Sequence, residues 1–246
     1  MVHVPQSEWS VRASVGSGFA ARTPFVDEIE ATGLGALRPL HGLHAERAVT
    51  ASLDAKCADH GWDVNASVFT SEIRDPLEGQ SAPGQKLELV NAPGPRRAPG
   101  AEALIRYVTG PLQLIASWSY LDVTEGITPG ARQCAPLVPR HGELAGIIEN
   151  EKRGRIGLEL GYTGRQALTE DPYRSISEPY FGLNALGEIR FRGLSIFLNA
   201  INLTNVRQTP FEPLIRPTPG PGGNPITDVW APLAGRTFNL GIRAEM

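Results

Sequence analysis

The sequence predicts an all-β fold, an antiparallel up-and-down transmembrane β-barrel, and three observations support this prediction. Apolar and polar residues alternate along most of the 246-residue chain, which is the pattern of strands with two different faces. The connections between these segments alternate between short turns and long loops, as in barrels whose two ends have different roles. Aromatic residues such as Trp9, Trp62 and Phe238 lie near strand ends, where membrane barrels carry their aromatic girdles.

Each strand candidate follows this alternation in turn. The first begins with Trp9 on an apolar face and Ser10 on a polar face, and the last places Phe238 opposite Asn239. The fourth carries three prolines in its first half and is predicted as one interrupted strand. We predict about ten strands, at residues 9–17, 43–57, 62–73, 87–109, 112–122, 141–150, 155–163, 180–191, 194–201 and 236–246.

The connections divide into two groups by length. Short ones lie at 59–61, 110–111, 151–154 and 192–193, and long ones at 18–42, 74–86, 123–140, 164–179 and 203–235. A Greek-key sandwich mixes its loop lengths less regularly, so the alternation favours a barrel. The last long loop contains seven prolines and is expected to be irregular and mobile.

Composition excludes some classes of protein. No apolar run reaches the roughly 18–20 residues that a membrane-spanning helix needs. The net charge of -3 argues against a nucleic-acid partner, which requires a basic face. The start of the chain has neither the basic nor the apolar region of a secretory signal. An exported barrel needs one, so we expect the chain to be a piece of a longer protein if it is a membrane barrel.

Two segments at opposite ends of the chain carry a family resemblance. Residues 9–28 read W-S-V-R-A-S-V-G-S-G-F-A-A-R-T-P-F-V-D-E, and residues 202–205 read N-L-T-N. In this order they resemble the barrel of bacterial outer-membrane TonB-dependent receptors. In that family a strand ending G-x-G-F-x-A-P-[ST] opens a large outer loop, and a late N-L-[TF]-[ND] ends the penultimate strand. Glu46, Asn91 and His141 are further family-like details.

The resemblance implies the fold and the function of the parent protein. Residues 1–246 would form the last ten strands of a barrel of about 22, without the plug domain. The parent would be a receptor, not an enzyme, in the cell outer membrane, for energised uptake of a siderophore, cobalamin or carbohydrate. Its partners would be outer-membrane lipid, the nutrient and, through the missing plug only, the TonB complex. No cofactor is implied, and the end Ala244-Glu245-Met246 departs from the family's terminal aromatic residue.

Ligand contacts are expected in the long loops and the upper lumen. Arginines there suit anionic ligands, although each could equally serve only to solvate its loop. The ligand-binding candidates are Phe19, Arg22, Phe25, Arg96, Arg140, Arg207 and Trp230.

Neither a catalytic nor a metal site is predicted. His41 and His44 are three residues apart, so on a strand they face opposite sides. The only pair suggestive of catalysis is Asp122 with His141, and the sequence gives no further support for it. Cys57 and Cys134 are expected at opposite ends of the barrel, roughly 25 Å apart, and therefore as free thiols, because a disulfide needs Cα atoms within about 7 Å.

Two alternatives remain open on the sequence alone. One is a small outer-membrane barrel of about ten strands that closes on itself, as a porin or a rim enzyme. The other is a soluble all-β binding module, which must bury its apolar faces.

Overall fold

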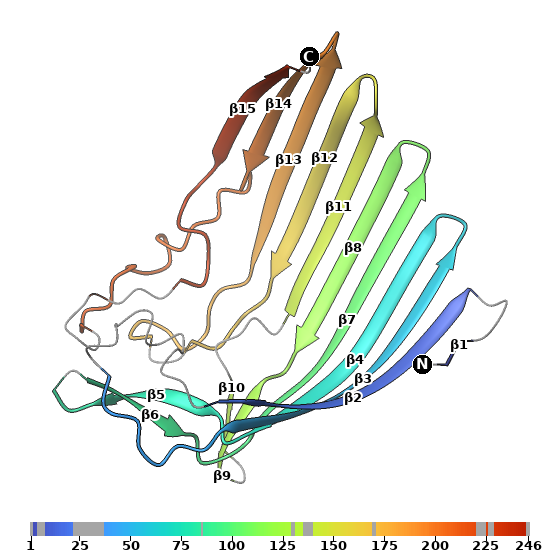
Figure 1. The fold of residues 1–246 in the computed structure, drawn as a ribbon. Helices are drawn as coiled ribbons and strands as arrows, with labels where there is room; N and C mark the ends of the chain where they lie inside the picture. Colours follow the sequence, from blue (N-terminus) through green and yellow to red (C-terminus); the bar gives the residue numbers. More distant parts are fainter. Residues whose placement is uncertain are drawn as a thin grey trace.

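The computed structural model describes residues 2–3, 8–21, 37–84, 86–128, 131–134, 140–168, 171–219, 225 and 229–244. These residues are arranged in strands, turns and loops, and none of them forms a helix long and apolar enough to cross a membrane. Most strands join one large, curved antiparallel sheet (Figure 1). The all-β prediction is confirmed.

Ten long strands form the wall of this sheet, and each pairs with its neighbour in chain order. Their registers are antiparallel throughout. The wall strands are β2 (Trp9–Ala20), β3 (Glu46–Asp59), β4 (Trp62–Arg74), β7 (Arg96–Thr109), β8 (Leu112–Leu121), β11 (Arg140–Asn150), β12 (Gly154–Thr163), β13 (Tyr180–Phe191), β14 (Leu194–Ile201) and β15 (Thr237–Ala244).

Five shorter strands accompany the wall. β1 (Val2–His3) pairs with β2 over two residues. β5 (Leu77–Ala82) and β6 (Lys86–Asn91) form a separate hairpin. β9 (Thr124–Thr128) and β10 (Ala131–Cys134) form another, in which β9 also pairs with the first residues of β7. The predicted single strand at 87–109 is therefore wrong. It is two strands, because the stretch with Pro93 and Pro95 leaves the ladder between β6 and β7.

The two ends of the wall differ. Short turns lie together at one end, and the long connections, with β5, β6, β9 and β10, lie at the other (Figure 1). Two of the turns are tight because both central residues adopt positive φ, at His60-Gly61 (43° and 87°) and Arg192-Gly193 (50° and 78°). Such primed turns match the twist of antiparallel strands.

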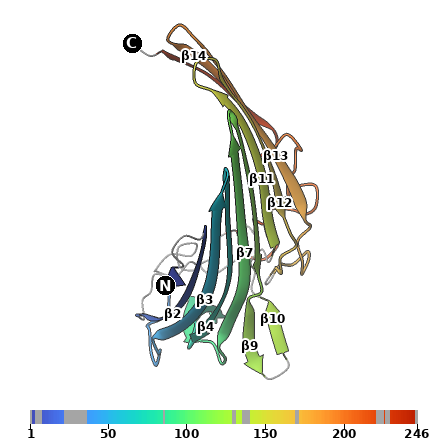
Figure 2. The same cartoon turned by 90° about the vertical axis from the view of Figure 1, so that its right-hand side faces the viewer.

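The wall is an open, trough-like sheet rather than a closed barrel (Figure 2). Among the described residues, β15 pairs only with β14, and the outer edge of β2 is covered only by the two residues of β1. Both edges of the sheet therefore present backbone hydrogen-bonding groups to any further strand.

One face of the wall is apolar from strand to strand and is not covered by other described elements. Register places Val15, Leu158, Leu198 and Leu240 on this apolar face, and their exposed fractions are 80%, 56%, 46% and 71%. A soluble β-sheet protein buries such a face. A buried apolar cluster of Leu43, Leu87 and Leu89 lies beside the wall at the β5–β6 hairpin instead.

The opposite, polar face contains mostly polar and small residues. Examples are the register pairs Glu159 with Asn184 and Asn199 with Asn239. Two glycines on this face lie opposite phenylalanines, and a Cβ at Gly241 would overlap the Phe197 ring. Covering a strand glycine with a cross-strand aromatic ring stabilises the pairing register.

Candidate functional site

Exposed aromatic residues mark the two margins of the apolar face. In β2 they are Trp9 and Phe19, and in β13 they are Phe181 and Phe191, ten residues apart in both strands. At about 3.3 Å per residue and a tilt of about 40°, that spacing gives a band about 25 Å tall. Trp62 and Tyr107 extend the margin at the short-turn end, with ring centroids 4.4 Å apart. The band has the dimensions and aromatic edges of a membrane-facing wall.

Two long loops are joined by a polar and aromatic cluster. Glu212, from the loop after β14, is buried and pairs with Arg174 of the loop before β13 (Nε to Oε2, 2.6 Å). The same carboxylate accepts hydrogen bonds from Trp230 Nε1 and from Gln208 Nε2, the latter at 2.9 Å. Arg174 also lies 5.3 Å from the centre of the Trp230 ring. We call Arg174, Gln208, Glu212 and Trp230 the loop cluster.

The loop cluster gives the last long loop a small core of its own. Gln208 and Trp230 are 1% and 5% exposed. The Gln208 side-chain oxygen accepts the Trp230 backbone N–H at 3.0 Å, and the Gln208 backbone N–H donates to the Pro232 carbonyl at 2.9 Å. The described residues of this loop are irregular, as predicted from the prolines, but they pack together through these buried contacts.

The Asn-Leu-Thr-Asn motif ties the end of β14 to the far end of the same loop. Asn202 adopts a positive φ of 56° and is buried. Its side-chain NH2 donates to the carbonyls of Val206 (2.7 Å) and Ala234 (3.0 Å), and its oxygen accepts the Val206 N–H (2.9 Å). Asparagine suits this position because it tolerates left-handed backbone and has both donors and an acceptor.

Asn202→Ala is expected to loosen the base of the last loop. The change leaves two carbonyls and one N–H without their partner and removes a residue that favours positive φ, for a cost of about 2–4 kcal/mol. Faster cleavage within residues 203–235 in limited proteolysis would show it. Asn205→Ala is the matched control, since among the described residues its side-chain oxygen accepts one weak hydrogen bond, from Arg236 N–H at 3.4 Å. Equal cleavage of the two variants would contradict this role for Asn202.

Two further family-like positions, Glu46 and Asn91, anchor the β5–β6 hairpin. The Glu46 carboxylate accepts the Leu77 N–H at 2.6 Å. The Asn91 side chain accepts the His44 N–H at 2.7 Å and donates to the carbonyls of His44 and Asp75. These contacts hold the hairpin against the long-loop ends of β3 and β4.

The structure separates the ligand-binding candidates. Phe19 (81% exposed) and Arg140, which stacks on Tyr120, lie on the apolar face. Arg96 lies on the polar face and pairs with Glu78 at 3.5 Å.

The remaining candidates lie in the loops. Arg207 is exposed and Trp230 is buried in the loop cluster. Arg22 and Phe25 lie outside the described residues. The ligand role of all seven candidates is untested and remains a proposal.

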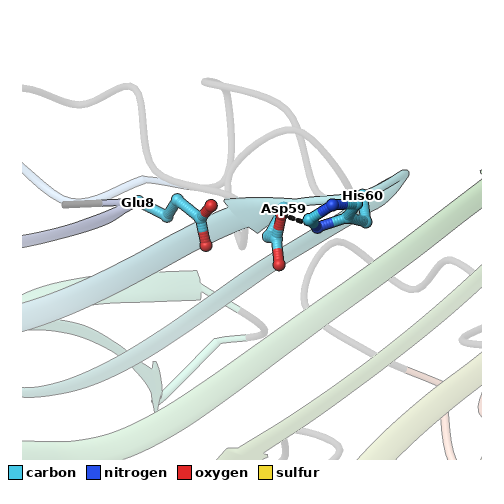
Figure 3. Close-up of side chains that lie close together, drawn as sticks. All are labelled: Glu8, Asp59 and His60. Carbon is cyan, nitrogen blue, oxygen red and sulfur yellow. Dashed lines mark ion pairs between the residues drawn. The ribbon is translucent and has the colours of Figure 1, made fainter. Parts of the chain in front are cut away.

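A small group of metal-capable side chains lies at the short-turn end. Glu8, Asp59 and His60 bring one donor atom each within 4.8 Å (Figure 3), and Asp59 pairs with His60. Glu8 and His60 are exposed, and acidic surface groups of this kind are common without a metal, so we assign none. Cys57 in β3 is a free thiol. The Cys134 side chain lies outside the described residues, so the predicted separation of the two thiols is untested.

These features define a class of structure, the curved antiparallel wall of a large β-barrel with long loops at one end. No protein-family model matches the sequence, and a search of the curated proteins finds no match. Solved structures do match. The wall superposes on TonB-dependent receptors, so the chain has the fold of part of such a receptor's barrel.

Three of these structures illustrate the likeness. The FrpB iron transporter from Neisseria meningitidis matches with a TM-score of 0.68 at 18% identity. The ferric yersiniabactin uptake receptor FyuA from Yersinia pestis and the copper transporter OprC each match with a TM-score of 0.70 at 15% identity. Each match covers 98% of this chain but only 37%, 36% and 38% of the respective receptor. The chain therefore spans little more than a third of their length.

Proposed function

We propose that this chain is the C-terminal barrel segment of a TonB-dependent receptor in the cell outer membrane. The observation that carries the proposal is the match of 98% of the chain to about a third of each receptor. The receptor would take up a scarce nutrient by binding it in the long loops and passing it through the barrel once the plug is rearranged. This chain supplies the wall, the loops and the polar lumen face, and so it does not transport alone.

The open edges support a fragment rather than a complete barrel. Each unpaired backbone group in hydrocarbon costs several kcal/mol. Two open edges would expose on the order of ten such groups, for a total of tens of kcal/mol. An open sheet therefore does not persist in lipid, and β2 and β15 require partner strands from the rest of the receptor.

The nutrient is proposed to be a metal ion or a metal chelate. The matched structures are named as transporters or receptors for iron, ferric yersiniabactin and copper. This favours a siderophore-like cargo over the cobalamin and carbohydrate classes that the resemblance also allows. Arg96 on the polar face and Arg207 in the last loop are positioned to meet an anionic chelate.

A second candidate function is a small barrel that closes on itself. The wall has an even number of strands, so β2 and β15 run antiparallel and could pair directly. Such a barrel would be a porin or a rim enzyme, and it would need no missing strands.

Expression of the full chain with an added export signal distinguishes the receptor fragment from the self-closed barrel. If it is a receptor fragment, it yields aggregated or degraded protein on its own and a membrane-inserted form only with the strands it lacks. A folded band that changes its gel migration on heating, obtained from the chain alone, would support the self-closed barrel instead. A soluble monomer would contradict both membrane functions.

A further inference from the structure

Three arginines meet on the apolar face at the long-loop end. Register aligns Phe19 with Arg47 and Arg47 with Arg74, across β2, β3 and β4. It also aligns Glu72 with Arg97 of β7. These residues are far apart in sequence and lie side by side only because of the strand pairing. We call Arg47, Arg74 and Arg97 the basic rim.

The basic rim presents its charge outward. Glu72 accepts one hydrogen bond from Arg74 Nε (3.0 Å) and one from Arg97 Nε (3.1 Å). The side chains of Arg74 and Arg97 are 71% and 64% exposed, and their terminal nitrogens have no other recorded partner among the described residues. Arg47 is exposed and has no recorded ion pair within the described part of the chain. One carboxylate among three guanidinium groups leaves a net charge of about +2.

An apolar hollow lies next to the basic rim. It measures about 480 Å³, and its lining includes Phe19, Val49, Arg47 and Arg74. The short-turn margin of the same face is mainly aromatic, with Trp9, Trp62, Tyr107 and Phe191, and a single arginine, Arg192, lies 5.0 Å from the centre of the Phe191 ring. Within the described strands, the three neighbouring arginines of the basic rim lie at the long-loop margin.

We propose that the basic rim binds the phosphate-bearing headgroup of an anionic lipid in the leaflet on the long-loop side. Guanidinium forks match phosphate geometry, and the acyl chains would lie along Phe19 and Val49 on the apolar face. The inference rests on the proposed membrane placement of the wall. It concerns the outer surface of the barrel, which is separate from nutrient binding in the loops and lumen.

Vesicle flotation of the full chain, refolded together with the receptor strands that complete its barrel, tests the proposal. The probes are vesicles of phosphatidylcholine alone and of phosphatidylcholine mixed with phosphatidylglycerol. We expect tighter binding to the mixed vesicles, with each arginine contributing roughly fivefold near an anionic surface. The triple variant Arg47→Gln, Arg74→Gln, Arg97→Gln should lose this preference by a factor on the order of tenfold or more. The preference should also weaken with added salt.

A matched variant removes three arginines from the polar face, Arg12→Gln, Arg106→Gln and Arg243→Gln. It should keep the preference for anionic vesicles. An equal loss in both variants, or no preference in the unmodified chain, would overturn the proposal. So would abolition of the preference by inorganic phosphate, which would indicate a small-anion site. Failure to bind any vesicle would instead contradict the proposed membrane function itself.

Discussion

Leu158→Arg is expected to prevent stable insertion of the wall into a membrane. Leu158 is 56% exposed on the apolar face of β12, and register pairs it with Ala185, about midway between Phe181 and Phe191. An arginine near the midplane of a barrel's lipid face costs about 2–4 kcal/mol. Because RT is about 0.6 kcal/mol, this lowers the insertion equilibrium by a factor of about 30 to 1,000. The measurement uses the chain together with the strands that complete its barrel, and the fraction of chain that resists urea extraction from vesicles gives the effect.

Leu186→Arg is the matched control, because it makes the same chemical change on the other face. Leu186 pairs with Gly157 in register and lies on the polar face, next to Asn199. An arginine there points into the lumen, where polar residues are accommodated, so extraction should change by well under tenfold. If the two variants show equal resistance to urea extraction, the apolar face does not face lipid. That result would also contradict the proposed membrane function.

The sequence predicted the wall well because a period of two is a local signal. Nine of the ten predicted strands overlap a single wall strand each, from β2 to β15. Alternation sorts residues such as Trp9 and Ser10 onto two faces whatever the tertiary context. The short strands β5, β9 and β10 all lie inside predicted loops. Such short hairpins carry too few alternating positions to stand out from a polar loop.

The sequence predicted the site less well because its contacts are long-range. Glu212 and Arg174 are 38 positions apart in two different loops, and nothing local marks either as buried. The residues of the basic rim likewise become neighbours only when the registers of β3, β4 and β7 are known. Asn202 is a partial exception, since its motif and its bonds to Val206 are local, but its bond to the Ala234 carbonyl spans 32 positions and has no local signal.

Glu212→Ala is expected to open the last long loop while leaving the wall intact. The Glu212 side chain is 2% exposed, and its removal leaves the guanidinium of Arg174 without its nearest anion. It also removes the carboxylate that accepts hydrogen bonds from Trp230 Nε1 and Gln208 Nε2. Breaking a buried ion pair from one side costs about 3–5 kcal/mol. Hydrogen-exchange protection of the Gln208 and Trp230 amides should therefore fall by about 100- to 1,000-fold or more.

Two further variants separate charge pairing from packing. Glu178→Ala removes an exposed partner of Arg174, 3.6 Å away and 45% exposed, so it should lower protection less than about fivefold. The double variant Arg174→Met, Glu212→Leu removes both charges, and an apolar replacement of a buried pair is often neutral. Recovery of protection in the double variant would mean that the pair is costly to break but not required to hold the loop. No recovery would mean that the hydrogen bonds from Gln208 and Trp230 to the carboxylate hold the two loops together.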